Sequence, residues 1–232
     1  MFDPAAIADL PLTKIVLAMG SLGTAAYGVV DVSKAFGGGI SNRGFGDITT
    51  AVSKFIPAPA PGDKSALTLP SVLVTLRANW LNGMALGDQK AIAKALIKLN
   101  LNPASAPGMA AATGVDAAVL ASIASKLSTG VALTAIETDA FGRFDLLLTA
   151  VLDQGYQRGD QRYRNSAKLL AVPVAVVLAL LGLWAVNPHD LQAMDYWKAV
   201  AAGILATPLA PIAKDVAGAI TTASKVAQAW KK

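Results

Sequence analysis

The chain has 232 residues, of which 54% are hydrophobic and only 15% charged, with a formal net charge of +5 and a mean hydropathy of +0.50. Soluble domains usually carry about 25% charged residues, so this composition indicates a membrane protein. The absence of cysteine excludes disulfides and thiolate chemistry, and a single histidine excludes a metal site built on two histidines of one chain. We therefore expect no metal and no cofactor. Because the basic residues are scattered, we also expect no nucleic-acid partner.

The first apolar segment runs from about Leu10 to Val30. Its small residues would also suit a secretory signal peptide, which begins with a positively charged region. Here Asp3 and Asp9 precede the segment, and no Lys or Arg occurs before Lys14. We therefore predict a retained membrane helix.

The stretch after this segment is predicted to be a helical domain. Glycines 37–39 and the proline-rich stretch 56–62 indicate linkers, and Gly44 and Gly46 are interpreted as a flexible exit from the first helix, because the lysine of a phosphate-binding loop is missing. Period-two alternation is also missing, so no sheet is expected. A first helix is predicted over 69–81, with Pro70 in its first turn, and a second begins after Asp88 as its N-cap. A third is predicted to follow a capping box of Thr113 and Asp116 and to end at Gly130, and a fourth to run from Thr134 into the next apolar segment.

The second apolar segment, Leu169–Val186, is uncharged and long enough to approach the ~30 Å hydrocarbon core of a bilayer. Pro173 is expected to bend it. A collar of basic and aromatic residues precedes the segment and is typical of a cytoplasmic membrane face. The basic members are predicted to contact anionic lipid headgroups; the alternative is that they only fix the topology. The collar comprises Tyr156, Arg158, Arg162, Tyr163, Arg164 and Lys168.

The third apolar segment, about 196–213, is short and is expected to be broken by Pro208 and Pro211. The tail that follows has apolar residues at three- and four-residue spacing and ends in Trp-Lys-Lys. This pattern fits a helix on the inner membrane surface, or equally a helix packed on the inner domain. The apolar positions are Ile212, Val216, Ile220, Ala223, Ala227 and Trp230.

Two spans carry small residues at four-residue intervals, a pattern that lets membrane helices approach closely. Their partners would be other spans of the same chain or other copies of it. The positions are Gly20, Thr24 and Gly28 in the first span and Ala202, Ala206 and Ala210 in the third.

Candidate catalytic residues are few. Glu137, Asp139, Asp145 and Asp153 fall near helical spacing, and paired carboxylates can perform acid–base chemistry. The simpler interpretation is a solvated helix face beside Arg143, and we expect no enzyme. His189 is expected in an exposed turn. Because Lys14, Asp31 and Lys198 all lie near span ends, an ion-coupled transporter is also disfavoured.

The sequence thus predicts an all-α integral membrane protein with about three transmembrane helices, a helical cytosolic insert and an amphipathic C-terminal helix. Its predicted parts are 1–36, 37–167, 168–213 and 214–232. The distribution of Lys and Arg places the N-terminus outside and the C-terminus in the cytoplasm. The expected function is a non-enzymatic scaffold or anchor subunit of a homo-oligomer or larger membrane assembly, and an oligomeric pore is the alternative. The expected location is a bacterial inner membrane, with a virion membrane as the alternative.

Overall fold

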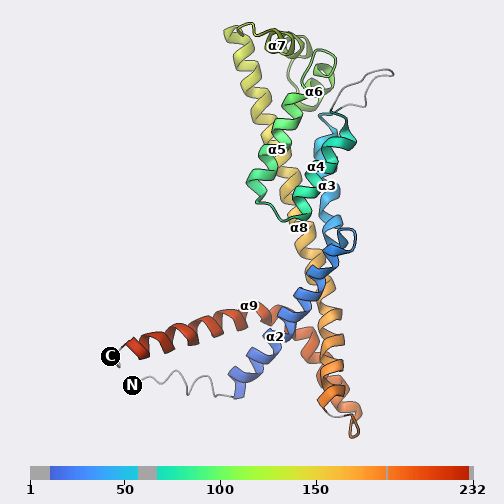
Figure 1. The fold of residues 1–232 in the computed structure, drawn as a ribbon, viewed down its shortest axis with the longest axis vertical. Coiled ribbons are helices and arrows are strands. Elements are labelled where there is room, and N and C mark those ends of the chain that lie inside the picture. The colour runs from blue at the N-terminus through green and yellow to red at the C-terminus, as the bar shows by residue number, and fades with distance from the viewer. Residues whose placement is uncertain (1–10, 57–66, 187, 230–232) are drawn as a thin grey trace. The chain divides into compact units, whose positions relative to one another are not determined.

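The computed structural model of the chain describes residues 11–56, 67–186 and 188–229, and over these residues it is all-helical, with no strand (Figure 1). Most of the predicted linker 56–62, and Trp230 of the predicted apolar pattern, lie outside the described residues. The chain divides into two compact units. The three-helix unit comprises the chain up to Ile40 together with Arg164 onward, and the insert unit comprises Ser41–Tyr163.

Within the described ranges, three helices are long and apolar enough to cross a membrane, so the all-helical class with three candidate spans is confirmed. They are α2 (Pro11–Val32), α8 (Ala135–Val186) and α9 (Ala193–Ala229). The predicted helix from Thr134 into the second apolar segment is α8. The two end residues of the apolar segment within α8 are exposed: Leu169 is 77% exposed and Val186 is 86% exposed, as expected of side chains that contact lipid.

Helix α9 is continuous through Pro208 and Pro211, so the predicted break at these residues is wrong. Each proline removes one backbone donor, but such losses are tolerated in membrane helices that pack against neighbours. Here Ala206, Ala210 and Ala213 are buried, so the proline region of α9 is held by packing.

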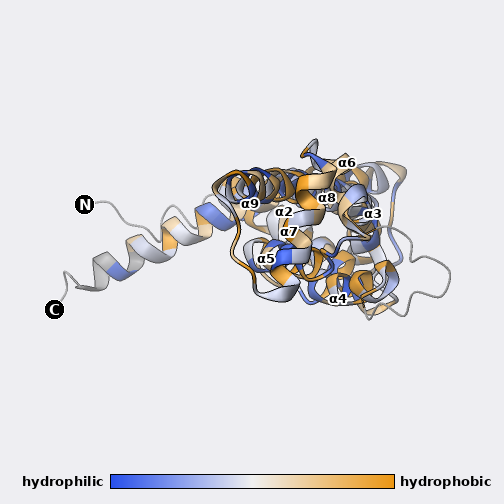
Figure 2. Ribbon diagram, turned by 90° about the horizontal axis from the view of Figure 1, so that it is seen from above, coloured by the Kyte–Doolittle hydropathy of each residue, from blue (hydrophilic) through white to orange (hydrophobic). Residues whose placement is uncertain are grey.

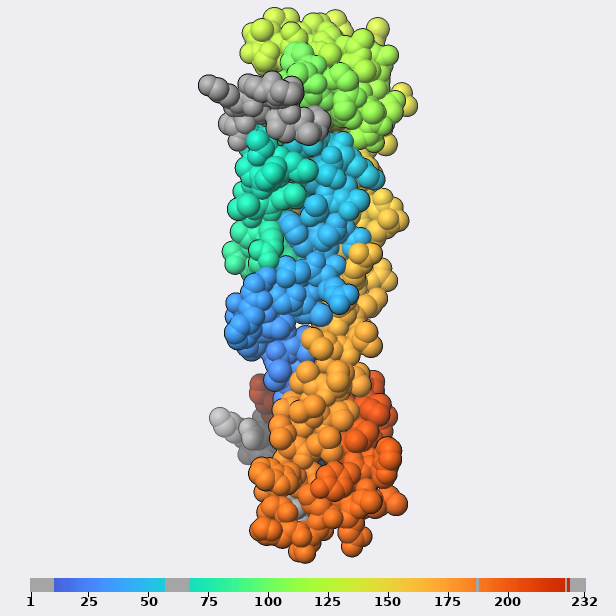
Figure 3. All heavy atoms as spheres, turned by 90° about the vertical axis from the view of Figure 1, so that its right-hand side faces the viewer, coloured from blue at the N-terminus to red at the C-terminus, as the bar shows by residue number. Residues whose placement is uncertain are grey.

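The buried core of the three-helix unit is rich in alanine. Ala26 and Val30 of α2, Ala171 and Ala175 of α8 and Ala206 of α9 form one buried cluster. Figure 3 shows α8 and α9 side by side in this unit, in orange and red-orange. Gly203 makes this approach possible, since a Cβ there would lie 2.5 Å from Cα of Val176.

The insert unit consists of short helices packed around the first part of α8. They are α3 (Asn42–Ser53), α4 (Leu69–Leu81), α5 (Leu86–Leu99), α6 (Ala106–Thr113) and α7 (Ala117–Thr129); the short 3-10 turns η1 (Ser33–Ala35) and η2 (Gly39–Ser41) precede them in the chain. Its fully buried side chains include Ile48, Phe55, Leu76, Ile97, Met109, Leu120, Ile123, Phe144, Leu148 and Tyr156.

Some of the helix ends predicted from local sequence signals are confirmed, and others are wrong. The helix over 69–81 is confirmed, with Thr68 and Ser71 forming a capping box, and Gly130 ends α7 at a φ of +72°. Asp88 is not an N-cap, because α5 already begins at Leu86. The Thr113–Asp116 box is also wrong: Asp116 alone caps α7, accepting from the backbone N–H of Val119 at 2.9 Å.

Gly44 is part of a helix, so its interpretation as a flexible exit is wrong. It lies in α3, against Gly159 of α8, and a Cβ at Gly159 would lie 2.7 Å from the backbone oxygen of Gly44. Gly155, one turn earlier in α8, lies against the methyl group of Ala51 of α3, and a Cβ at Gly155 would lie 2.5 Å from it. Trp80 lies beside this crossing and donates its indole N–H to the Ser41 oxygen at 3.0 Å. Glycines at these positions let α3 and α8 approach backbone to backbone.

Candidate functional site

Two of the four candidate carboxylates form ion pairs between α5 and α8. Lys90 pairs with Asp153, and Lys94 pairs with Asp145 at 2.6 Å. Lys98 also pairs with Asp145 and lies over the ring of Phe141, 5.2 Å from its centroid. Burial raises the pKa of Asp145, but the ammonium groups of Lys94 and Lys98 outweigh burial and lower it overall. These charges join two helices of the insert unit.

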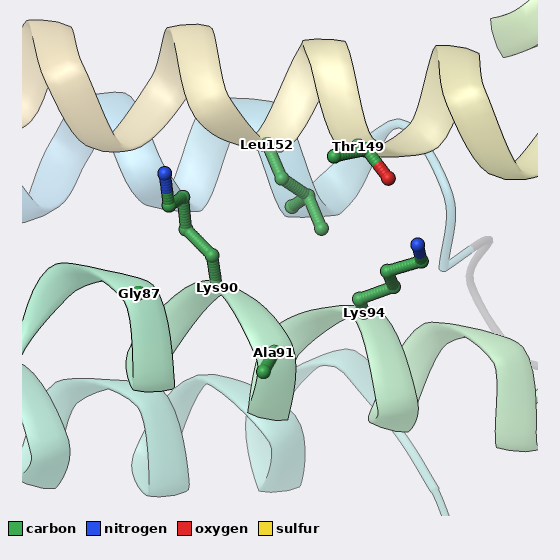
Figure 4. Close-up of a pocket in the computed structure, with 6 residues that line it drawn as sticks. All are labelled: Gly87, Lys90, Ala91, Lys94, Thr149 and Leu152. Carbon is green, nitrogen blue, oxygen red and sulfur yellow. The ribbon is translucent and has the colours of Figure 1, made fainter.

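A small cavity lies between the same two helices (Figure 4). Its volume is about 220 Å³, and it is lined by Gly87, Lys90, Ala91, Lys94, Thr149 and Leu152. Because both lysine ammonium groups are bound to aspartates, the two lysines contribute mainly their aliphatic stems to the lining. The cavity is therefore a gap in the α5–α8 packing flanked by ion pairs.

Glu137 is the most strongly held carboxylate. It is 7% exposed, accepts from Lys126 Nζ at 2.6 Å and from Ser122 Oγ at 2.7 Å, and accepts from the backbone N–H of Thr134 at 2.8 Å. Thr134 in turn accepts from the N–H of Glu137, which completes a capping box at the start of α8. The hydrogen bond from Lys126, with those from Thr134 and Ser122, lowers the pKa of Glu137 to about 2.

The insert unit is expected to lose stability in acid through Glu137. Its lowered pKa means that the carboxylate stabilises the fold fully above its ordinary pKa of 4.5 and progressively less as the pH falls toward about 2. The melting temperature should fall over this window, and Glu137→Gln should flatten the change. Thermal unfolding of both forms between pH 6 and pH 2.5, followed by circular dichroism, measures this difference. Parallel curves for both forms would rule out the assignment to Glu137.

Asp139, the fourth carboxylate, lies on a groove between α8 and the turn joining α6 to α7. The groove has a volume of about 370 Å³ and mixes apolar and charged side chains. It is lined by Thr113, Gly114, Val115, Asp116, Val119, Ile136, Asp139, Ala140, Arg143 and Leu147. The structure does not bring Asp139 into the lysine-bound set of Glu137, Asp145 and Asp153. Across the described ranges, no group of three or more metal-ligating side chains is placed to hold an ion.

The basic residues of the collar are exposed, but its aromatic residues are not. Arg158, Arg162, Arg164 and Lys168 all lie on the surface of α8, and Arg162 pairs with Asp47 of α3 at 3.3 Å. The prediction that Tyr156 and Tyr163 mark a membrane face is wrong: Tyr156 is 1% exposed in the insert core. Tyr163 packs edge-on against Trp80, with ring centroids 6.3 Å apart. Both tyrosines complete the packing of the insert unit.

Exposed aromatic residues instead lie at the other end of the apolar segment. Trp184, Tyr196 and Trp197 flank the link between α8 and α9 and are 63%, 48% and 70% exposed. Aromatic side chains of this kind concentrate at membrane interfaces. From Arg164 to Trp184 the helix rises about 30 Å, the thickness of a hydrocarbon core. These three aromatic residues were not among the residues singled out from the sequence, although their positions next to the link were a usable signal. His189, in the same link, is exposed, as expected.

The small residues of the spans divide between two faces of α2. Gly20 packs against Ala213, and Gly23 against Ala206 and Ala210, so the inner face follows Gly20, Gly23 and Ala26. Thr24 and Gly28 do not share that face; both are exposed, and a Cβ at Gly28 would meet nothing within 4 Å. In α9, Ala206 and Ala210 are buried while Ala202 is half-buried. On α2 the contacts inside this chain follow a three-residue step from Gly20 to Ala26, which the four-residue pattern did not reveal. On α9 they include Ala206 and Ala210 at the predicted four-residue spacing.

No family model matches the chain, and neither a curated protein nor a solved structure matches it.

Proposed function

We propose that this chain is a non-enzymatic anchor or scaffold subunit that self-associates in a membrane. The observation that carries the proposal is the outer small face of α2, formed by Ser21, Thr24, Ala25 and Gly28. All four residues are exposed, although the opposite face of the same helix is packed on α9. A second copy would use this face.

The outer small face suits close contact with another helix inside lipid. Its two hydroxyl groups are already satisfied within α2: Ser21 donates to the oxygen of Leu17 at 2.8 Å, and Thr24 donates to the oxygen of Gly20 at 2.9 Å. Small residues without unpaired polar groups let two backbones approach, and such packing drives helix association in membranes.

The insert unit would supply the contact surface of the assembly outside the bilayer. Its lysine-bound carboxylates support a structural role for these charges, and Ile136 and Leu146 remain 76% and 71% exposed. Arg158, Arg162, Arg164 and Lys168 are proposed to contact anionic headgroups, each contributing about 1 kcal/mol near an anionic surface. On this proposal the N-terminus is outside, the C-terminus is cytoplasmic, and the membrane is a bacterial inner membrane.

Gly28→Leu is expected to convert the oligomer into monomers without unfolding the chain. A Cβ at Gly28 would meet nothing within 4 Å, and Gly28 lies on the exposed face of α2, so the added side chain should act mainly on a helix that approaches from outside. Native mass spectrometry of particles released from nanodiscs gives the copy number as multiples of the 23.7 kDa chain.

Gly182→Leu is the matched control, because Gly182 is also exposed in a membrane segment with nothing within 4 Å. It should leave the copy number unchanged. A parent chain that is monomeric in nanodiscs, or a Gly28→Leu variant with the parent's copy number, would contradict self-association through this face. Ion conductance by the parent oligomer in liposomes would favour the pore instead of the scaffold.

A further inference from the structure

The last part of α9, residues 212–229, is a helix with one apolar and one polar side. Ile212, Val216, Ile220 and Ala223 recur at three- and four-residue spacing, and the last three are half-buried while Ile212 is 51% exposed. Lys214, Thr221, Thr222 and Lys225 lie on the other side and are exposed. Figure 2 shows polar and apolar residues alternating along this part of the helix.

This part of α9 begins at the level of the basic collar. Helices α8 and α9 run antiparallel, since Gly203 contacts Val176 and Ala206 joins Ala171 and Ala175 in one cluster. Lys168 precedes Ala171 by one helical turn, and Pro211 follows Ala206 by little more than one turn. The chain therefore reaches the membrane boundary marked by Lys168 at about the position of its two prolines.

Within the three-helix unit, the last part of α9 does not follow the direction of the apolar segment of α8. In Figure 1 its last part, in red, runs across the direction of the apolar segment of α8, and Figure 2, turned by 90°, shows it lengthwise. Ala213 still contacts Gly20 of α2 at the start of this part. A helix that leaves the spanning direction at the level of the headgroups lies along the membrane surface.

The charges identify the kind of surface. Between Ile212 and Lys232 the sequence contains four lysines, Lys214, Lys225, Lys231 and Lys232, against one aspartate, Asp215. Each lysine near an anionic leaflet contributes about 1 kcal/mol, and a helix with a basic polar side and an apolar side binds at the headgroup boundary.

We propose that residues 212–229 form an in-plane helix that binds the anionic membrane surface on the side of Lys168, with Val216, Ile220 and Ala223 turned into the lipid. This inference rests on the membrane embedding of the three helices and is independent of the scaffold role. A monomeric chain would have the same surface helix, so failure of either proposal is recognised separately.

The absence of cysteine allows single-site labelling of the full chain. Ala223→Cys and Thr221→Cys place a fluorophore on the apolar and the polar side of the same helical turn, which makes each the control for the other. Both variants are reconstituted in vesicles of phosphatidylcholine and phosphatidylglycerol. Quenching is measured with iodide in water, with lipids that carry a nitroxide near the headgroup, and with lipids that carry it deep in the acyl chain.

The expected result is that the headgroup-level nitroxide quenches the Ala223 label at least threefold more than the Thr221 label, and that iodide shows the reverse order. A headgroup-level nitroxide should also quench the Ala223 label more strongly when phosphatidylglycerol carries it than when phosphatidylcholine carries it. A Lys214→Gln, Lys225→Gln variant should reduce the ratio of these two quenching efficiencies. Equal iodide access for both labels would overturn the proposal in favour of a helix away from lipid. Stronger quenching of both labels by the deep nitroxide than by the headgroup-level nitroxide would overturn the proposal in favour of a longer span. If the double lysine variant left the ratio of quenching by the two lipids unchanged, the role of the lysines would be overturned.

Discussion

Gly159→Val is expected to destabilise the insert unit by about 3 kcal/mol, near the upper end of the usual cost of overpacking a core. The Cβ would lie 2.7 Å from the backbone oxygen of Gly44 and 3.4 Å from Cγ1 of Ile48. Because the closest atom belongs to the backbone of a helix, no side-chain rotation can relieve the overlap. The helices α3 and α8 would have to separate, which would loosen the packing of Trp80 between them.

Gly142→Val provides the control, because Gly142 lies in the same helix and a Cβ there meets nothing within 4 Å. Thermal unfolding should show a drop of about 10 °C for Gly159→Val and almost none for Gly142→Val. Hydrogen exchange should accelerate in α3 and in the adjacent turns of α8. If the two variants have the same melting temperature, the close crossing of α3 and α8 is not a feature of the folded protein.

Gly23→Leu is expected to separate α2 from α9 in the three-helix unit. A Cβ at Gly23 would overlap the carbonyl oxygen of Ala206 and lie 3.0 Å from Cβ of Ala210. With a cost of about 3 kcal/mol, hydrogen exchange of the α2 backbone in nanodiscs should accelerate by about two orders of magnitude.

Gly28→Leu serves as the comparison on the same helix, since it adds the same side chain to the exposed face. It should leave the exchange of α2 unchanged while it lowers the copy number. The two variants thus separate contact within a chain from contact between chains. Slow exchange in Gly23→Leu would show that α2 does not pack on α9 through this residue.

Hydropathy was enough to predict the helical class and the three apolar helices, because burial in lipid needs only length and absence of charge. The helix over 69–81 was also predicted from a local signal, Pro70 in the first turn. The long helix from Thr134 was predicted from apolar residues that continue into the second apolar segment. Helix α3 was missed because Gly44 and Gly46 lower helix propensity. The sequence alone does not show that Gly159 of α8 lies against Gly44, which explains the glycine at this one position. Tertiary contact overrides a local signal at this point.

The candidate site shows the same division. Helical spacing in the sequence identified the four carboxylates as candidates. It could not pair Lys126 with Glu137 or Lys94 with Asp145, since the two lysines lie on other helices than the carboxylates. Tyr156 was misassigned to the membrane face for a related reason. An aromatic residue beside arginines suits either an interface or a core, and only the packing of α8 against the insert helices decides between them.

The alanine-rich junction where α2, α8 and α9 meet has a consequence for how the spans respond to force. Alanine has no rotamers, so Ala26, Ala171, Ala175 and Ala206 lose no side-chain entropy when they come into contact. For the same reason they cannot repack. A displacement at this junction separates methyl groups that have no other rotamer with which to restore contact, and the loss of their dispersion contacts opposes it. The junction should therefore behave as a stiff pivot that braces α8 and α9 close to Pro173 and Pro208, where each proline removes a backbone donor.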